Sequence, residues 1–316
     1  MDFTVQKRWL LARLFEPDLV IVDCRFWLED PEAGKSRYEE SHLPRAVYLD
    51  LKRDLSDPPA AHGGRHPLPS VERMAAVFGR AGIRRDSRVV VYDDNEGMNA
   101  ARVWWMLSYL GHEQVYVLEQ GFSAWKDAGY PVTSDQPVVI PTNYEVTAAA
   151  AHLRVDVERV REVSASLSGL DSGAGSGVGP GAGPGAGSGA KSADSPAQPT
   201  VLIDSRSRER YEGRSETLDP VAGHIPGAVN FFWKEVLNED GSFKSAEQLR
   251  DHFAGIDPAS EIIVYCGSGV TACPNVLALR KAGFPNVKLY PGSWSDWISY
   301  PENPVVTGKE EEPKEV

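Results

Sequence analysis

The sequence predicts an α/β protein made of two similar domains, and three observations lead to this prediction. Short runs of β-branched residues alternate with stretches of helical periodicity along most of the chain. The strand-like runs are apolar at consecutive positions, which is typical of parallel strands covered by helices on both faces. Several motifs also occur twice in the same order. We therefore expect two mainly parallel sheets, each with helices on both of its faces.

The repeated motifs define the two copies. They are residues 20–25 (VIVDCR) with 201–206 (VLIDSR), 41–46 (SHLPRA) with 223–228 (GHIPGA), 89–93 (VVVYD) with 262–266 (IIVYC), 111–115 (GHEQV) with 283–287 (GFPNV), and Trp125 with Trp297. The offset is 181 and 182 at the first two pairs and 172 or 173 at the later three. Shared order with one change of offset indicates a duplicated domain. The first copy carries an insertion around residues 50–69.

The second copy gives the clearest order of elements. Strands are predicted at 201–204, 228–231, 262–265 and 287–290, and helices at 245–254 and 271–282. The runs at 20–23 and 89–92 are the matching buried strands of the first copy. Ligands of such sheets bind beyond the carboxyl ends of the strands. This rule directs attention to Asp93 and Cys266, each of which directly follows a strand.

Two segments differ in composition from the rest of the chain. Residues 164–199 have ten glycines, including every odd position from 173 to 189, and almost no large apolar side chains. Such a stretch cannot bury enough surface to offset its ordering entropy, so we interpret it as a flexible linker. The charged tail 309–316 should also be solvated. The domains are therefore predicted at 1–150 and 200–308.

Composition excludes several classes of protein. The chain has 316 residues, about two ordinary domains, with 41% hydrophobic and 25% charged residues, close to globular averages. No apolar run reaches 18 residues, and the N-terminus lacks the features of a secretory signal. A net charge of −12 argues against nucleic-acid or anionic-membrane binding. Three cysteines fit a reducing cytoplasm. We expect a cytoplasmic monomer or weak dimer.

The segment 262–272 (IIVYCGSGVTA) is the most informative one for function. A buried strand ends at Cys266, and two glycines then let the loop curl before helical periodicity resumes. Such a loop points backbone N–H groups inward, and the helix dipole adds positive potential. Both favour a thiolate, whose pKa falls from about 8.5 to roughly 3.5–7.5 in such settings. The alternative is an inert buried cysteine.

This loop and the duplicated frame resemble the tandem rhodanese-domain sulfurtransferases, and CGSGVTA resembles the active loop of those that use 3-mercaptopyruvate. The DSR, GHIPGA and YLGH segments belong to the same resemblance. It implies two rhodanese-like domains and a Cys266 that carries sulfur as a persulfide. The first domain is then non-catalytic, with Asp93 in place of the cysteine. Backbone groups of Gly267, Gly269, Val270 and Thr271 would hold the persulfide charge, without any metal or organic cofactor.

The resemblance also implies the partners: a small anionic sulfur donor, and an acceptor that is cyanide or a thiol such as thioredoxin. Thiosulfate-using relatives carry a basic residue two positions after the cysteine, where this chain has Ser268. A neutral loop therefore favours 3-mercaptopyruvate, with thiosulfate as the alternative. A non-catalytic persulfide carrier is a further alternative. Phosphatase chemistry needs an arginine six positions after the cysteine, where this chain has Ala272.

Arginines and a relay complete the predicted site. Arg206 and Arg210 lie in a basic cluster after a strand, and guanidinium groups bind carboxylates in a bidentate manner. The resemblance assigns them to the anionic group of the substrate. It also implies a Ser/His/Asp relay, which maps onto Ser268, His66 and Asp50. His62 is an alternative to His66, and a metal site on these two histidines is the competing interpretation.

Overall fold

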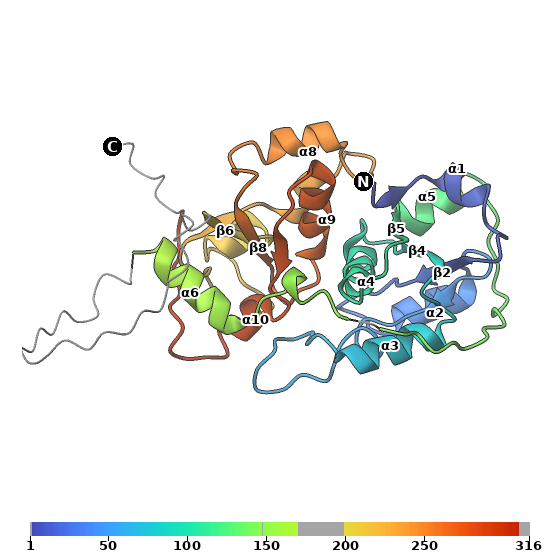
Figure 1. Cartoon of the computed structure of the whole chain (residues 1–316), viewed down its shortest axis with the longest axis horizontal. Coiled ribbons are helices and arrows are strands. Elements are labelled where there is room, and N and C mark those ends of the chain that lie inside the picture. The colour runs from blue at the N-terminus through green and yellow to red at the C-terminus, as the bar shows by residue number, and fades with distance from the viewer. Residues whose placement is uncertain (1, 147, 170–198, 310–316) are drawn as a thin grey trace, which may run out of the picture.

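The computed structural model describes residues 2–146, 148–169 and 199–309, which form two α/β domains side by side (Figure 1). The helices are α1 (Lys7–Leu11), α2 (Ala33–Glu40), α3 (Val71–Arg80), α4 (Met98–Tyr109), α5 (Gly121–Asp127), α6 (Val157–Leu167), α7 (Arg208–Tyr211), α8 (Ala246–His252), α9 (Cys273–Ala282) and α10 (Ser293–Trp297), with 3₁₀ turns η1 (Ala151–Leu153) and η2 (Trp233–Val236). The strands are β1 (Thr4–Val5), β2 (Leu19–Asp23), β3 (Val47–Tyr48), β4 (Arg88–Tyr92), β5 (Val115–Leu118), β6 (Thr200–Asp204), β7 (Ala228–Asn230), β8 (Glu261–Tyr265) and β9 (Val287–Leu289). None of the described helices is long and apolar enough to cross a membrane.

Each domain is built on one parallel sheet. The strand order is β1-β5-β4-β2-β3 in the first domain and β7-β6-β8-β9 in the second, and all neighbours pair in parallel. Val89 and Val91 of β4 enter one hydrophobic cluster, whereas Val90 and Tyr92 enter another. Both faces of the sheet are therefore covered, which confirms the predicted fold class. β4 and β8 occupy equivalent central positions in their sheets.

The predicted strands of the second domain end within one residue of the observed ones. The predicted linker needs a correction at its start, because α6 continues to Leu167. Val160 and Val163 of α6 are buried against the second domain, and the Ser164 hydroxyl donates to the Pro226 carbonyl at 2.8 Å. These contacts hold residues 164–167 in the helix. The predicted linker residues 170–198 and tail residues 310–316 lie outside the described part of the chain.

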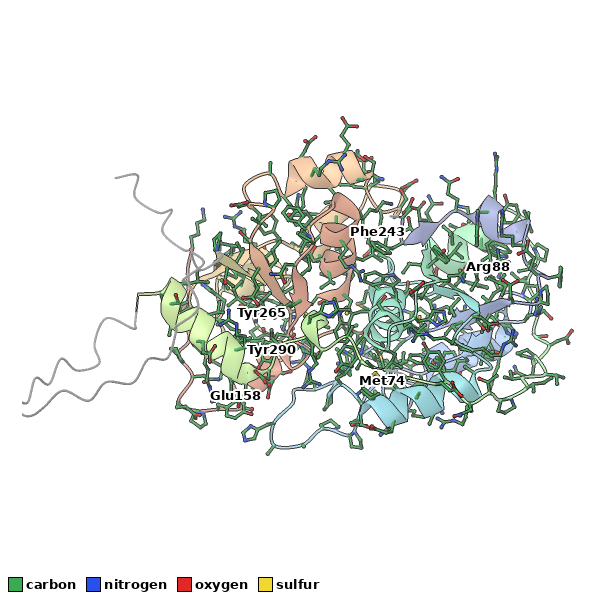
Figure 2. The ribbon with its side chains drawn as sticks, viewed as in Figure 1. Met74, Arg88, Glu158, Phe243, Tyr265 and Tyr290 are labelled. Carbon is green, nitrogen blue, oxygen red and sulfur yellow. The ribbon has the colours of Figure 1, made fainter. Side chains whose placement is uncertain are left out.

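The two domains share a hydrophobic core. α4 of the first domain packs against α9 of the second (Figure 1). One continuous cluster of buried side chains includes Trp104 of α4 and Val276 of α9. Phe243 lies at the domain boundary (Figure 2), with its ring against Gly97. Burial of apolar surface stabilises the folded state by about 25 cal/mol per Å². The shared core therefore fixes the positions of the loop before α4 and the loop before α9 relative to each other.

Candidate active site

Cys266 follows β8 and begins a loop that leads into α9. The Trp294 N–H donates to the Cys266 carbonyl at 2.9 Å, so the start of the loop is attached to α10. Gly269 has a φ of +75°, and a Cβ at this position would lie 2.1 Å from the Pro291 carbonyl oxygen. Only glycine fits there. The predicted tight curl of this loop is thus present.

The first domain has an equivalent loop that begins with Asp93, directly after β4. The buried Asp93 carboxylate accepts hydrogen bonds from four backbone N–H groups of its own loop, those of Asn95, Gly97, Asn99 and Ala100, at 2.8–3.0 Å. Burial raises the pKa of Asp93, and the four donors oppose that shift. The loop backbone therefore forms a cradle for negative charge, and in this domain the Asp93 side chain fills it.

In the second domain the same cradle begins with Cys266 instead of a carboxylate. Among the described residues, no acceptor receives a hydrogen bond from the backbone N–H groups of residues 267–272. They follow Cys266 in the chain as most of the first domain's donors follow Asp93. They are available to bind a thiolate, a persulfide or an anionic ligand.

A loop of the first domain crosses to the second domain beside Cys266. This loop, residues 56–69, is called the clasp here, and it extends from α3 toward α10 (Figure 1). The Gly63 N–H donates to the Asp296 carboxylate at 2.6 Å. The His62 ring stacks on Tyr300 at 4.0 Å, and its Nδ1 lies 2.8 Å from the Ser299 hydroxyl. His62 therefore anchors the clasp to the second domain.

The clasp brings His66 to the Cys266 loop. His66 Nδ1 lies 2.8 Å from the Ser268 hydroxyl oxygen, and both side chains are buried. Burial lowers the pKa of His66 to about 3, and the neighbouring charges of Arg102, Arg65 and Lys52 lower it further. The imidazole is therefore neutral near pH 7. Two of the three predicted relay residues are thus brought together.

Asp50, the third predicted member of the relay, makes its hydrogen bonds within its own turn. Its carboxylate accepts the backbone N–H groups of Lys52 and Arg53 at 2.9 and 2.8 Å, so it closes the turn after β3. No hydrogen bond joins Asp50 to His66 in the structure. The resemblance assigned Asp50 to the relay although the spacing in this segment is longer than in the family's animal members, and in the structure its carboxylate accepts hydrogen bonds of the local turn.

Two arginines, one from each domain, flank the start of the Cys266 loop. Arg210 of α7 and Arg65 of the clasp both bind Asp219, and Arg210 also pairs with Glu216 at 2.9 Å. A Cβ at Gly267 would lie 3.0 Å from Arg65 Nη2 and 3.4 Å from Arg210 Nη2. The buried Nε of Arg65 has no hydrogen-bond partner among the described residues. An anion next to Gly267 can therefore bind both guanidinium groups.

Arg206, which was predicted to bind substrate, belongs instead to the framework of its domain. Its fully buried guanidinium binds the Asp204 carboxylate and the Gly223 carbonyl, each at 2.6 Å. Arg25 forms the same pair with Asp23 in the first domain, at 2.7 Å. That domain has no cysteine after its central strand. Because both copies use the motif in the same way, its role is to hold the fold.

A cavity of about 240 Å³ lies at the domain boundary over these groups. Its walls include Gly267, Ser268, Val270 and Thr271 of the loop, together with Arg65, His66 and Arg210, and the apolar side chains Phe26, Trp27 and Met98 of the first domain. Gly269 does not line it. Of the lining residues, Arg65 was missed by sequence reasoning, although its position next to His66 was a usable signal. Nothing in the sequence indicated that Trp27 and Met98 line the cavity.

A cysteine at the start of a loop with free backbone N–H groups, next to two arginines that come from two domains, is typical of cysteine-dependent group-transfer enzymes. The family model of the rhodanese-like domain matches residues 6–128 and 190–300 of this chain. A Pseudomonas aeruginosa protein named as a probable 3-mercaptopyruvate sulfurtransferase is 42% identical over 305 residues, which cover 95% of this chain and 96% of that protein. The thiosulfate sulfurtransferase of Bos taurus is 32% identical over 320 residues, covering 96% and 95%. The chain belongs to the rhodanese family.

Solved structures agree with this assignment. The 3-mercaptopyruvate sulfurtransferase of Escherichia coli superposes with a TM-score of 0.73 at 29% identity, covering 93% of this chain and all of that one. The enzyme of Leishmania major has the same TM-score at 27% identity, covering 93% of this chain and 73% of that one. The prediction of a tandem rhodanese-domain sulfurtransferase is therefore confirmed, and the chain is a sulfurtransferase of this family.

Proposed function

We propose that this sulfurtransferase takes sulfur from 3-mercaptopyruvate and carries it as a persulfide on Cys266. The contact between His66 and Ser268 supports this donor. When 3-mercaptopyruvate loses its sulfur, an enolate leaves, and negative charge develops on the former ketone oxygen. A hydroxyl placed at that oxygen stabilises the transition state. Thiosulfate leaves as sulfite and gains nothing comparable from a neutral hydroxyl.

Arg65 and Arg210 are the proposed binding groups for the donor carboxylate. Both lie against Gly267, next to Cys266. Guanidinium groups bind carboxylates with two parallel hydrogen bonds, which fixes orientation as well as affinity. A carboxylate held there directs the rest of a three-carbon donor toward the loop, where the cavity offers about 240 Å³.

The proposed transfer balances as follows. The Cys266 thiolate attacks the donor sulfur, an S–S bond forms, and the carbon–sulfur bond breaks with its electron pair passing to the carbon. The enolate takes up the proton that the donor thiol carried, giving pyruvate and an anionic Cys266 persulfide. The free N–H groups of residues 267–272 bind that charge. An acceptor then removes the outer sulfur and regenerates the thiolate. This acceptor is cyanide or a thiol such as that of thioredoxin.

Thiosulfate remains the second candidate donor, and one observation favours it. The loop has no basic residue between Cys266 and Cys273, but the structure places the guanidinium groups of Arg65 and Arg210 against it. A neutral loop in sequence is therefore not a neutral site. Asp219 and Glu216 offset these two charges, so the doubly charged donor gains less from the pair than from an unpaired cation.

Steady-state kinetics with both donors test the proposal, with cyanide as the common acceptor. We expect kcat/KM to be at least tenfold higher for 3-mercaptopyruvate, which corresponds to about 1.4 kcal/mol of transition-state discrimination. A preference for thiosulfate would overturn the donor while leaving Cys266 as the nucleophile. Activity retained in Cys266→Ser would overturn the persulfide itself.

A further inference from the structure

Three arginine side chains are almost completely buried in the described part of the chain, namely Arg25, Arg102 and Arg206. Arg25 and Arg206 each bind the aspartate that ends the strand before them, Asp23 at 2.7 Å and Asp204 at 2.6 Å. Arg102 of α4 has no carboxylate within 4.0 Å among the described residues. It therefore differs from the other two in carrying a buried positive charge without a negative partner from an acidic side chain.

Carbonyl oxygens supply all the hydrogen bonds of Arg102 that the structure shows. Its Nη1 donates to the Gly269 carbonyl at 2.9 Å, and its Nη2 donates to those of Leu55 and His66, each at 3.0 Å. One guanidinium group thus joins the region before the clasp, the histidine that contacts Ser268, and the Cys266 loop. Arg102 is consequently close to the reacting thiol without lining the cavity.

A buried cation is unfavourable unless a negative charge lies near it, because carbonyl dipoles replace only part of its hydration. Burial lowers the pKa of Arg102, and the negative charges of ionised Cys273 and Cys266 oppose that shift. Cys273 donates its thiol to the Gly269 carbonyl at 3.4 Å, and burial raises its pKa well above the ordinary value. Cys273 therefore stays protonated and does not supply a compensating charge.

The other charges of the site already balance. Three cations meet three carboxylates in one network: Arg65, Arg206 and Arg210 with Asp204, Glu216 and Asp219. His66 is neutral, as shown above. Arg102 is thus the buried cation near Cys266 for which the described residues provide no acidic partner. Lys52, whose charge also acts on His66, is exposed to solvent.

We propose that Arg102 is the buried counter-ion of Cys266, stabilising first its thiolate and then its anionic persulfide. The proposal rests on the proposed function only in taking Cys266 as the nucleophile. Arg102 touches neither donor nor acceptor in this arrangement, so it is a positioning and electrostatic residue. Its site on the first domain gives that domain a direct part in the chemistry although it lacks a cysteine of its own at the equivalent loop.

The pH dependence of Cys266 alkylation by iodoacetamide tests this proposal without any sulfur donor. Peptide mass spectrometry follows Cys266, Cys24 and Cys273 separately in the same samples. We expect Arg102→Gln to raise the midpoint of Cys266 alkylation by at least about one pH unit, whereas Arg102→Lys, which keeps the charge, stays closer to the wild type. Arg280→Gln is the matched control, because it removes a half-buried arginine that faces Phe3 and Trp104 at the same domain boundary.

Each outcome separates the alternatives. An unchanged midpoint in folded Arg102→Gln would overturn the proposal, and so would an equal shift in Arg102→Lys, because the carbonyl hydrogen bonds and not the charge would then be responsible. If Arg102→Gln does not fold, Arg102→Lys decides by the same criterion. A wild-type Cys266 that reacts no faster than Cys24 at neutral pH would instead contradict the nucleophile, and with it the proposed function.

Discussion

His66 and Ser268 lie 202 positions apart in the chain, yet His66 Nδ1 is 2.8 Å from the Ser268 hydroxyl. The first domain supplies the histidine through the clasp, and the second supplies the serine through the loop that begins with Cys266. The clasp that carries His66 is also attached to α10, through the hydrogen bond from Gly63 to Asp296. The contact between His66 and Ser268 is therefore a product of domain packing, and each domain alone would lack it.

Replacing the serine separates the two candidate donors. Ser268→Ala should lower kcat/KM for 3-mercaptopyruvate by about 10²-fold, because the ketone oxygen loses its hydroxyl partner as charge develops. The value for thiosulfate should change by only a few-fold. Ser299→Ala, which removes a hydroxyl from the far end of the clasp contact, is the control. Equal losses with both donors would contradict the proposed role of Ser268.

The low pKa of His66 links stability to pH. Burial lowers this pKa to about 3, whereas an unfolded histidine titrates near 6.5. The stability contributed by the neutral ring is complete above about pH 6.5 and is lost as the pH falls toward 3. At pH 5 the loss is about 2 kcal/mol. Urea unfolding of the wild type and His66→Gln should show their stability difference shrinking by this amount between pH 7 and pH 5. A constant difference would show that folding does not lower the pKa of this ring.

Two adjacent glycines of the clasp offer a matched comparison. Gly63 and Gly64 have φ values of +100° and +81°, so alanine is strained at both. A Cβ at Gly64 would also lie 2.4 Å from the Gly292 carbonyl oxygen, whereas the nearest atom to one at Gly63, on Pro67, is 3.6 Å away.

Gly64→Ala should therefore push the clasp off α10 and lower kcat/KM for every donor. Gly63→Ala should lower stability by about 1 kcal/mol with little effect on activity. Parallel kinetics and thermal unfolding measure both quantities. Equal activity of the two variants would show that the close contact between Gly64 and Gly292 has no effect on function.

The sequence predicted the fold well because the relevant signals are local. The run at 262–265 is apolar at every position, which indicates a covered parallel strand, and β8 is buried along its whole length. The glycines after Cys266 predicted the curl that Gly269 makes. These features depend on neighbouring residues, so no long-range information was needed to find them.

The site was predicted less completely, because the direction of a side chain depends on distant contacts. Arg206 follows β6 at the expected edge of the sheet, but Asp204 turns its guanidinium into the domain. Arg65 reaches the loop only because the clasp crosses to α10. Arg102 sits in an apolar helical stretch, where nothing in the sequence distinguishes a buried counter-ion from an ordinary surface arginine.

The two arginines beside Gly267 should act on donor binding, and they should act together. Arg65→Met and Arg210→Met should each raise KM for 3-mercaptopyruvate by about tenfold or more, because each removes a charge-assisted contact to the carboxylate. Both guanidinium groups also bind Asp219. The remaining arginine will therefore be repositioned in either single variant, and the double variant should lose less than the product of the two effects.

Arg208→Met is the control for this pair. Arg208 lies on the same short helix as Arg210, but its side chain is 64% exposed and pairs with Glu212 at 3.0 Å, so its loss should leave KM unchanged. An effect of Arg208→Met as large as that of Arg210→Met would show that general positive potential attracts the donor. Strict additivity of Arg65→Met and Arg210→Met would show two independent contacts. A selective, non-additive pair would place the donor carboxylate between the two domains, where Asp219 holds both arginines against the loop of the nucleophile.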